Sequence, residues 1–184
     1  KERMRHYFNE VGWPENIEDQ DAFIRELHRD KTALFMEIII SKQLELRPGI
    51  ARIVDEAIAD GMTLAVCSTS NIKSVTAVVE HLLGAERHAK FGGIFAGDMV
   101  KVKKPDPAIY NLAKTELGLD PSQCVVVEDT RNGLLAAKAA GMNCIVTKST
   151  YSKEEDFSDA DQVVEELGDG EGVVSLKDLK SLVD

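Results

Sequence analysis

The chain has 184 residues, 43% of them hydrophobic, and a formal net charge of −10. This length is enough for one good core, or for a core with a small appendage. The negative charge argues against general nucleic-acid binding, which needs a basic surface, so we expect no nucleic-acid partner. No apolar stretch approaches the roughly 20 residues that span a bilayer, so we expect no membrane partner. The first residue is Lys1 rather than Met, which indicates a processed form or a fragment of a longer chain.

The cysteines and histidines favour no metal site of their own. Cys67, Cys124 and Cys144 lie in or beside apolar runs, and no pair has the C-x-x-C spacing of a zinc site. They are typical of buried free thiols in a reducing compartment. The four histidines are scattered along the chain, and we interpret them as surface residues.

Residues 1–47 are predicted to be entirely helical. Trp13-Pro14 marks a break between two helices, and Pro48-Gly49 punctuates the end of the region. A domain boundary is therefore expected after residue 47. The prediction of helices in this region rests on four apolar residues that repeat at helical spacing: Phe23, Leu27, Leu34 and Ile38.

From residue 48 to residue 184 the pattern alternates between helices and short apolar strands. Strands without polar alternation are buried on both faces, so the sequence predicts an α/β fold with a Rossmann-like parallel sheet covered by helices. In such folds the site lies outside the carboxyl ends of the strands. Strands are expected at 63–67, 94–95, 124–127, 143–147 and 160–164, and helices at 50–58, 75–83, from Asp106-Pro107, at 134–140 and from Ser175.

The first strand end of interest is the run Ser68-Thr69-Ser70-Asn71. A hydroxyl and backbone N–H groups directly before a helix can hold a phosphoryl oxygen. The alternative is that Ser70 or Asn71 merely caps the following helix.

Two further strand ends carry charged residues. Lys104, before the helix that begins at Asp106-Pro107, could direct a fixed positive charge into a cleft; the alternative is a solvated basic loop that includes Lys103. Glu128-Asp129 directly follow a buried strand and suit a hard cation such as Mg²⁺, which binds through one or two carboxylates, water and phosphate. The alternative is a pair of helix N-terminal acids near Arg131.

A hydroxyl, a lysine and a metal-binding acid at three successive strand ends are the groups that a phosphoryl-transfer site needs. A response-regulator receiver uses similar groups, but its acids come first and its lysine last, so the order here disfavours it. The sequence contains neither G-x-G-x-x-G nor G-x-x-x-x-G-K-[ST], so dinucleotide and P-loop sites are disfavoured too.

Three of these stretches, residues 65–71, 103–110 and 125–129, resemble motifs II, III and IV of the haloacid dehalogenase superfamily. Residues 136–142 and the motif spacing resemble its β-phosphoglucomutase-like branch. Residues 7–9, 11–14, 46–49, 144–149 and 155–157 look like the plant and algal CbbY-type phosphatases, which dephosphorylate xylulose-1,5-bisphosphate in the chloroplast stroma. The resemblance covers nearly the whole chain.

The resemblance implies a role for each matching residue. Ser68 would hydrogen-bond the transferring phosphoryl group, and Thr69 and Asn71 would help to bind the substrate. Lys104 would bridge the phosphoryl group and the nucleophile. Asp129 would bind Mg²⁺ directly, and Glu128 would bind or orient it. Residues 1–47 would be a partial helical cap on which Lys1 and Arg3 meet the distal end of a phosphorylated sugar, and residues 48–184 would be the core of a monomer.

One departure from the family is large. Its motif I, D-x-D-G-[TV], supplies the nucleophile and the general acid/base, and no such motif occurs in this chain. Asp19 to Asp21 reads D-Q-D, but it lies within the predicted cap and no glycine follows. We therefore expect a phosphatase whose nucleophile and first strand precede Lys1. The 184 residues alone are then expected to be inactive. The alternatives are a β-phosphoglucomutase-like phosphotransferase and a non-catalytic binding or scaffold subunit.

Overall fold

The computed structural model describes residues 1–41, 44–169 and 173–183. The chain divides into two compact units, Lys1–Leu44 and Glu45–Asp184. The division falls slightly before the boundary predicted after residue 47, because the Arg47 side chain hydrogen-bonds to Thr147, Lys148 and Glu165 of the second unit. Whether the first unit is a partial cap stays a prediction.

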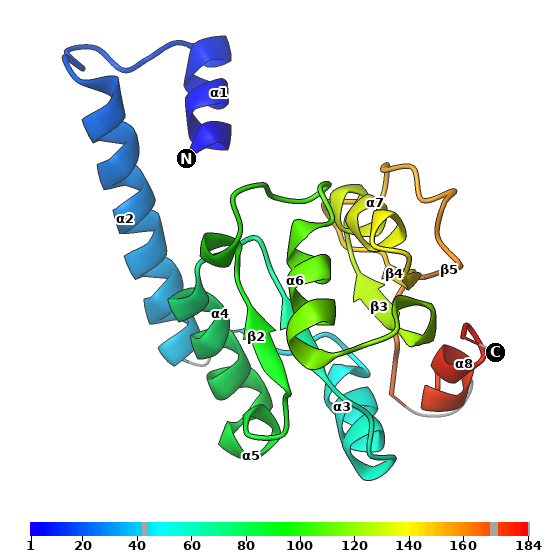
Figure 1. The fold of residues 1–184 in the computed structure, drawn as a ribbon. Coiled ribbons are helices and arrows are strands. Elements are labelled where there is room, and N and C mark those ends of the chain that lie inside the picture. The colour runs from blue at the N-terminus through cyan, green and yellow to red at the C-terminus, as the bar shows by residue number, and fades with distance from the viewer. Residues whose placement is uncertain (42–43, 170–172, 184) are drawn as a thin grey trace. The chain divides into compact units, whose positions relative to one another are not determined.

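The first unit consists of two helices, α1 (Glu2–Val11) and α2 (Gln20–Ile40) (Figure 1). The predicted break at Trp13-Pro14 is confirmed, since both residues lie in the connection between them. The Phe8 ring stacks on Trp13 at 5.3 Å and meets the edge of Phe23 at 5.5 Å, so an aromatic cluster holds the connection to both helices. Of the helices in the described ranges, none has both the length and the apolar character to cross a membrane.

The second unit alternates between helices and strands, as predicted (Figure 1). The predicted helix at 75–83 begins earlier, at Ile72, and finishes as a π-helical turn, Val79–Leu83. The strands are β1 (Ala65–Cys67), β2 (Gly93–Phe95), β3 (Val125–Glu128), β4 (Asn143–Thr147) and β5 (Gln162–Val164). The helices are α3 (Ile50–Ala59), α4 (Ile72–Val78), α5 (Ala85–His88), α6 (Ala108–Leu117), α7 (Arg131–Ala139) and α8 (Leu176–Lys180), with short 3-10 turns at Gly97–Met99 and Pro121–Gln123.

All strand pairs are parallel, which confirms the predicted sheet type, but the strands form two sheets. In one, β1 pairs with β2, and Cys67 lies opposite Phe95. In the other, β4 lies between β3 and β5, and Glu128 lies opposite Val146. Within the described ranges, β1 and β3 therefore each pair along one edge only.

Strand β4 is the most deeply buried element. Cys144 and Val146 pack with α6 and α7 on one face, while Ile145 packs with α3 and α8 on the other. All three side chains have 0% exposure. Burying an aliphatic side chain of this size contributes roughly 1.5–3 kcal/mol, so the helices hold this sheet from both sides. The predicted two-sided covering is confirmed here.

Candidate active site

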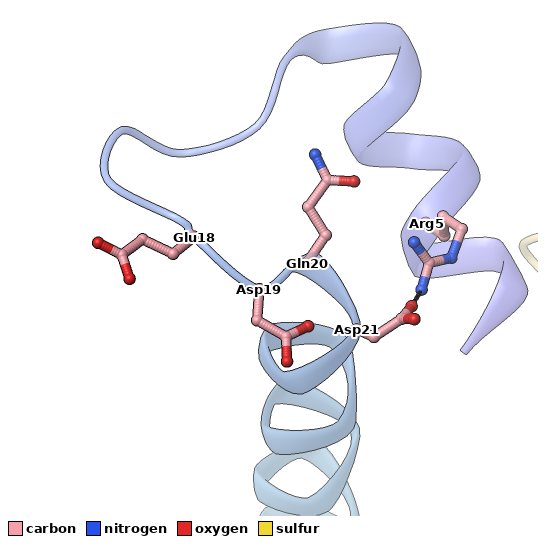
Figure 2. Close-up of a pocket in the computed structure, with 5 residues that line it drawn as sticks. All are labelled: Arg5, Glu18, Asp19, Gln20 and Asp21. Carbon is pink, nitrogen blue, oxygen red and sulfur yellow. Dashed lines mark hydrogen bonds and ion pairs between the residues drawn. The ribbon is translucent and has the colours of Figure 1, made fainter.

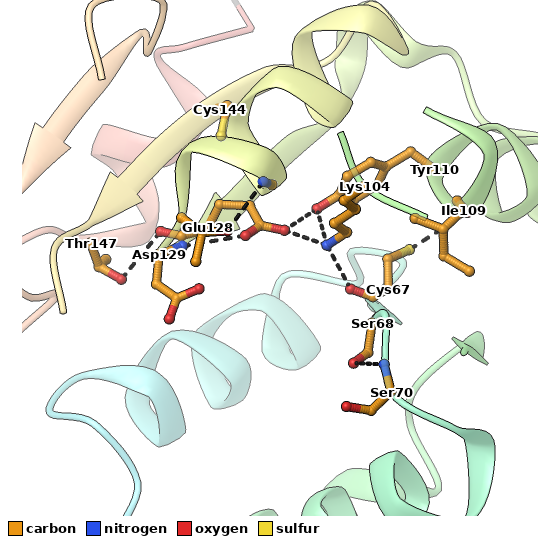
Figure 3. Close-up of polar contacts among 12 residues, drawn as sticks. Cys67, Ser68, Ser70, Lys104, Ile109, Tyr110, Glu128, Asp129, Cys144 and Thr147 are labelled. Carbon is orange, nitrogen blue, oxygen red and sulfur yellow. Dashed lines mark hydrogen bonds and ion pairs between the residues drawn. The ribbon is translucent and has the colours of Figure 1, made fainter. Parts of the chain in front are cut away.

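Several polar residues of the second unit lie at the carboxyl ends of its strands. Ser68 follows β1, Asp129 follows β3, and Thr147 ends β4. Parallel strands present their carboxyl ends at one edge of a sheet, and the Glu128–Val146 register places Thr147 beside the acids. Figure 3 shows Ser68, Lys104, Asp129 and Thr147 in one region of the unit.

Lys104 links the end of β1 to the end of β3. Its ammonium donates hydrogen bonds to the Cys67 carbonyl oxygen at 3.0 Å and to the Tyr110 hydroxyl at 2.9 Å, and it pairs with Oε1 of Glu128 (Figure 3). The Lys104 and Glu128 side chains are each only 9% exposed. The adjacent Lys103 is exposed, and its ammonium lies against Gly97 instead. The two neighbouring lysines thus diverge, and Lys104 is the one directed at the strand ends.

Tyr110 is part of this cluster, although no role was predicted for it from the sequence. It lies in the first turn of α6, is 5% exposed, and donates a hydrogen bond of 2.5 Å to Oε1 of Glu128. Burial, and then the negative charge of Glu128, raises the pKa of the Tyr110 phenol, so the hydroxyl keeps its proton. Two features of the sequence could have indicated that Tyr110 lies near Lys104: it follows Lys104 by six residues, and it lies on the inward face of the predicted helix.

Both oxygens of Glu128 are engaged. Oε1 accepts from Lys104 and Tyr110, and Oε2 accepts from the Asp129 amide at 3.4 Å. The carboxylate also lies against Gly133 of α7, where a Cβ would overlap it. In this arrangement Glu128 holds Lys104 in place. Its predicted role of binding or orienting Mg²⁺ stays a prediction.

Asp129 is exposed, in contrast to Glu128. Partial loss of hydration at the strand end, and then the negative charge of Glu128, raises the pKa of the Asp129 carboxyl above its usual value, while the Arg47 charge acts in the opposite direction. A nearby cation would relieve this cost. In the part of the chain that the structure describes, however, no three His, Cys, Asp or Glu side chains are grouped to hold a metal. Asp129 therefore fits as one ligand of a site that needs oxygen ligands from elsewhere.

The Ser68–Asn71 loop serves two purposes. The Ser68 amide donates to the Phe95 carbonyl at 2.9 Å, which extends the β1–β2 ladder, and the Ser68 hydroxyl accepts from the Ser70 amide at 3.2 Å. Asn71 accepts from the Ser74 amide at 3.0 Å and is the N-cap of α4, which is the alternative that the sequence left open for it. Its predicted contact with a substrate stays a prediction.

The chain that follows β2 packs against this loop at two points. Asp98, for which no role was predicted, accepts from the Ile72 amide at 3.1 Å, so the first turn of α4 already holds an acid. Thr69 lies close to Gly97, where a Cβ would overlap the Thr69 carbonyl. The carbonyl side of Thr69 is thus packed against the chain that follows β2, and its predicted contribution to substrate binding stays a prediction.

Lys1 and Arg3 belong to the helical unit, on which Lys1 precedes α1 and Arg3 is exposed in its first turn. Their predicted contact with the distal end of a substrate stays a prediction. In the same unit, Asp21 pairs with Arg5, and Asp19 caps α2 by accepting from the Ala22 amide at 2.9 Å. An open depression of about 320 Å³ is lined by Arg5, Glu18, Asp19, Gln20 and Asp21 (Figure 2). The D-Q-D acids thus have structural partners of their own.

Comparison with known proteins agrees with the strand-end motifs. The model of the haloacid dehalogenase-like hydrolase family matches residues 4–141. CbbY from Rhodobacter capsulatus is 39% identical over 91% of this chain and 72% of its own length. This chain belongs to the haloacid dehalogenase-like hydrolases, in their CbbY-like group. The resemblance seen in the sequence is confirmed.

Two other relatives show how much of their own length this chain covers. A CBBY-like protein of Arabidopsis thaliana is 60% identical over 92% of this chain, and the match spans 54% of that relative's length. A CbbY variant from Rhodobacter sphaeroides, solved in complex with xylulose-(1,5)bisphosphate, superposes with a TM-score of 0.83 at 37% identity, over 97% of this chain and 76% of that one. The chain therefore has the CbbY-like fold over most of its length and corresponds to about half of the plant relative.

Proposed function

We propose that this chain is the larger part of a magnesium-dependent phosphatase that hydrolyses a sugar bisphosphate such as xylulose-1,5-bisphosphate. The observation that carries the proposal is the buried Lys104–Glu128 pair, which joins the end of β1 to the end of β3. Burying an ion pair is costly, and a scaffold would gain little from keeping one at a strand end. Membership in the CbbY-like group and the ligand of the Rhodobacter sphaeroides variant support the substrate class.

In this proposal each residue acts on the transferring phosphoryl group or on its counter-charges. Ser68 donates a hydrogen bond to a phosphoryl oxygen, and Lys104 supplies a fixed positive charge beside it. Asp129 is a magnesium ligand, and Glu128 orients Lys104. Mg²⁺, when bound, neutralises negative charge on the phosphoryl oxygens. Thr69, Asn71, Lys1 and Arg3 contribute to substrate binding.

We propose that the nucleophile comes from an Asp-x-Asp segment that precedes Lys1 in the complete protein. The first Asp carboxylate attacks phosphorus, the sugar oxygen leaves with a proton from the second Asp, and water then releases phosphate from the aspartyl-phosphate. In the part of the chain that the structure describes, β1 and β3 each have one edge without a strand partner, which supports this proposal. A parallel strand between them would pair on both sides, and its carboxyl end would lie between Ser68 and Asp129.

The test is to express the full-length protein and measure phosphate release from xylulose-1,5-bisphosphate. We expect turnover that stops in EDTA, returns with Mg²⁺ and is abolished by Asp129→Ala. Equal activity in EDTA would exclude the magnesium mechanism. A full-length protein that binds the sugar bisphosphate without turnover would favour the scaffold alternative. A phosphatase of this class in plants is expected in the chloroplast stroma, which localisation of the full-length protein would test.

A further inference from the structure

The Arg47 guanidinium lies at the carboxyl ends of β4 and β5. Nη1 donates to the Thr147 carbonyl oxygen at 3.0 Å and to the Thr147 hydroxyl at 2.8 Å. Nη2 donates to the carbonyl oxygens of Lys148 at 2.6 Å and Glu165 at 2.9 Å. All four terminal N–H groups are therefore used, and a lysine could not reproduce this planar fork.

The partners of Arg47 connect it to the acids of the site. Thr147 is 4% exposed, and its hydroxyl donates to the Glu128 carbonyl oxygen at 3.4 Å (Figure 3). Because Arg47 donates to the same hydroxyl, the single hydroxyl proton is left for Glu128. The ladder gives a second connection, since Glu128 lies opposite Val146, the residue before Thr147. Arg47 thus fixes the end of β4, and the end of β4 fixes the end of β3, from which Asp129 projects.

Arg52 provides a comparison within the same unit. Its guanidinium donates to the carbonyl oxygens of Leu167, Gly168 and Val174 at 3.2, 2.9 and 2.8 Å, and to Glu56 at 2.9 Å. It therefore cross-links α3 to the segment before α8 in a similar way. None of these four partners belongs to β3 or β4. Arg52 is a structural cross-link without a connection to the acids, whereas Arg47 has one.

We infer that Arg47 is a positioning residue for the metal-binding end of β3, and that it acts through Thr147 on the geometry of Asp129. The inference rests on the proposed magnesium site and names a determinant of its affinity. Residues one shell away from metal ligands typically change metal affinity 10- to 100-fold when they are replaced. Arg47 acts on Asp129 through one more contact than Thr147 does. It donates hydrogen bonds to both the carbonyl oxygen and the hydroxyl of Thr147.

The experiment measures Mn²⁺ binding to the substrate-free, full-length protein by electron paramagnetic resonance, since Mn²⁺ takes the same oxygen ligands as Mg²⁺. The variants are Arg47→Lys, Thr147→Val and, as the matched control, Arg52→Lys. We expect Arg47→Lys to raise the Mn²⁺ dissociation constant about 10-fold or more, and Thr147→Val to raise it by a smaller factor in the same direction. Arg52→Lys should lower the thermal unfolding midpoint but leave the dissociation constant within about twofold.

Two outcomes would overturn the inference, and they differ from failure of the proposed function. If Arg47→Lys and Arg52→Lys lower the unfolding midpoint to the same extent and both leave the Mn²⁺ dissociation constant unchanged, the role of Arg47 is only structural. If Arg47→Lys does not fold, an unchanged dissociation constant for Thr147→Val excludes the connection to Glu128. Absence of Mn²⁺ binding by the wild-type protein would instead refute the proposed magnesium site, and the inference with it.

Discussion

The hydroxyl of Tyr110 lies 2.5 Å from Oε1 of Glu128 and, on its other side, accepts a hydrogen bond from Lys104 at 2.9 Å. One oxygen atom of α6 thus contacts both members of the buried ion pair. The Lys104 ammonium also lies 4.6 Å from the centroid of the Tyr110 ring, within the range of a cation–π contact. The phenol therefore stabilises both the charge and the direction of Lys104.

We expect Tyr110→Phe to weaken the site while preserving its shape. The change leaves the Glu128 carboxylate and the Lys104 ammonium each without one buried hydrogen bond, which costs about 1–3 kcal/mol. The unfolding free energy of the full-length protein should fall by about this amount, and kcat should fall with it. The control is Tyr7→Phe, because Tyr7 is 58% exposed on α1. Wild-type stability and kcat in Tyr110→Phe would show that the phenol has no role in holding the pair.

The neighbouring lysines should differ sharply in their effect on the rate. Lys104→Ala removes a charge directed at the strand ends, and losing one such oriented group costs roughly 10²–10³ in kcat. Lys103→Ala removes an exposed side chain and should leave kcat within a few-fold of wild type. Steady-state kinetics of the two variants of the full-length protein decides the matter. Similar losses in both variants would contradict the assignment of Lys104.

Gly133→Ala should be harmful, against the usual trend for helices. Alanine is normally favoured over glycine in a helix interior by about 1 kcal/mol, but a Cβ on Gly133 would overlap the Glu128 carboxylate. The carboxylate would have to move away from Lys104 and Tyr110, so we expect lower kcat and lower stability. Asn132→Ala, at the preceding exposed position of α7, is the control and should preserve both. A more stable, fully active Gly133→Ala variant would show that Glu128 has room to move.

Asp129→Asn should stabilise the metal-free protein at neutral pH while it abolishes activity. A carboxyl whose pKa is raised in the folded state binds its proton more tightly when folded, so stability is lost as the pH rises through that pKa. Asparagine carries no such penalty. Thermal unfolding of the full-length protein in EDTA should therefore show a higher midpoint for the variant at pH 7, and no difference below the unfolded pKa of about 3.9. A variant that is less stable than wild type at pH 7 would contradict the proposed direction.

The 184-residue chain by itself should lack phosphatase activity and be poorly stable. Within the described ranges, β1 and β3 each have one edge without a strand partner, and their side chains are half-buried or exposed, so they lack the packing and pairing of a central strand. A whole domain is stable by only about 5–15 kcal/mol, so this loss is large. Adding the preceding segment of the natural protein should restore both turnover and slow amide exchange in these strands. The measurements are phosphate release and hydrogen exchange, with and without that segment. Magnesium-dependent turnover by the chain alone would mean that its nucleophile lies within residues 1–184.

The order of helices and strands in the second unit could be predicted from the sequence, because local patterns encode it. The apolar run at 143–147 is β4, residue for residue, and Ser175 caps α8 with its hydroxyl on the Asp178 amide, as the sequence predicts. The strand-end motifs could be predicted for the same reason. Each is a short run of particular residue types at the end of a recognisable strand, and parallel strands bring such ends to one edge.

The partners of those motifs were decided only by the tertiary structure. The Arg47 guanidinium donates to the carbonyl oxygen of Glu165, 118 positions later in the chain. Arg47 and Thr147 are 100 positions apart in the chain, and Lys104 and Glu128, which form the buried pair, are 24 positions apart. Hydrophobic periodicity and turn residues fix local conformation, but they carry no record of which distant side chains will touch. Those contacts are set when the helices close over the sheets, because burial then obliges each polar group to find whichever partner the packing brings within reach.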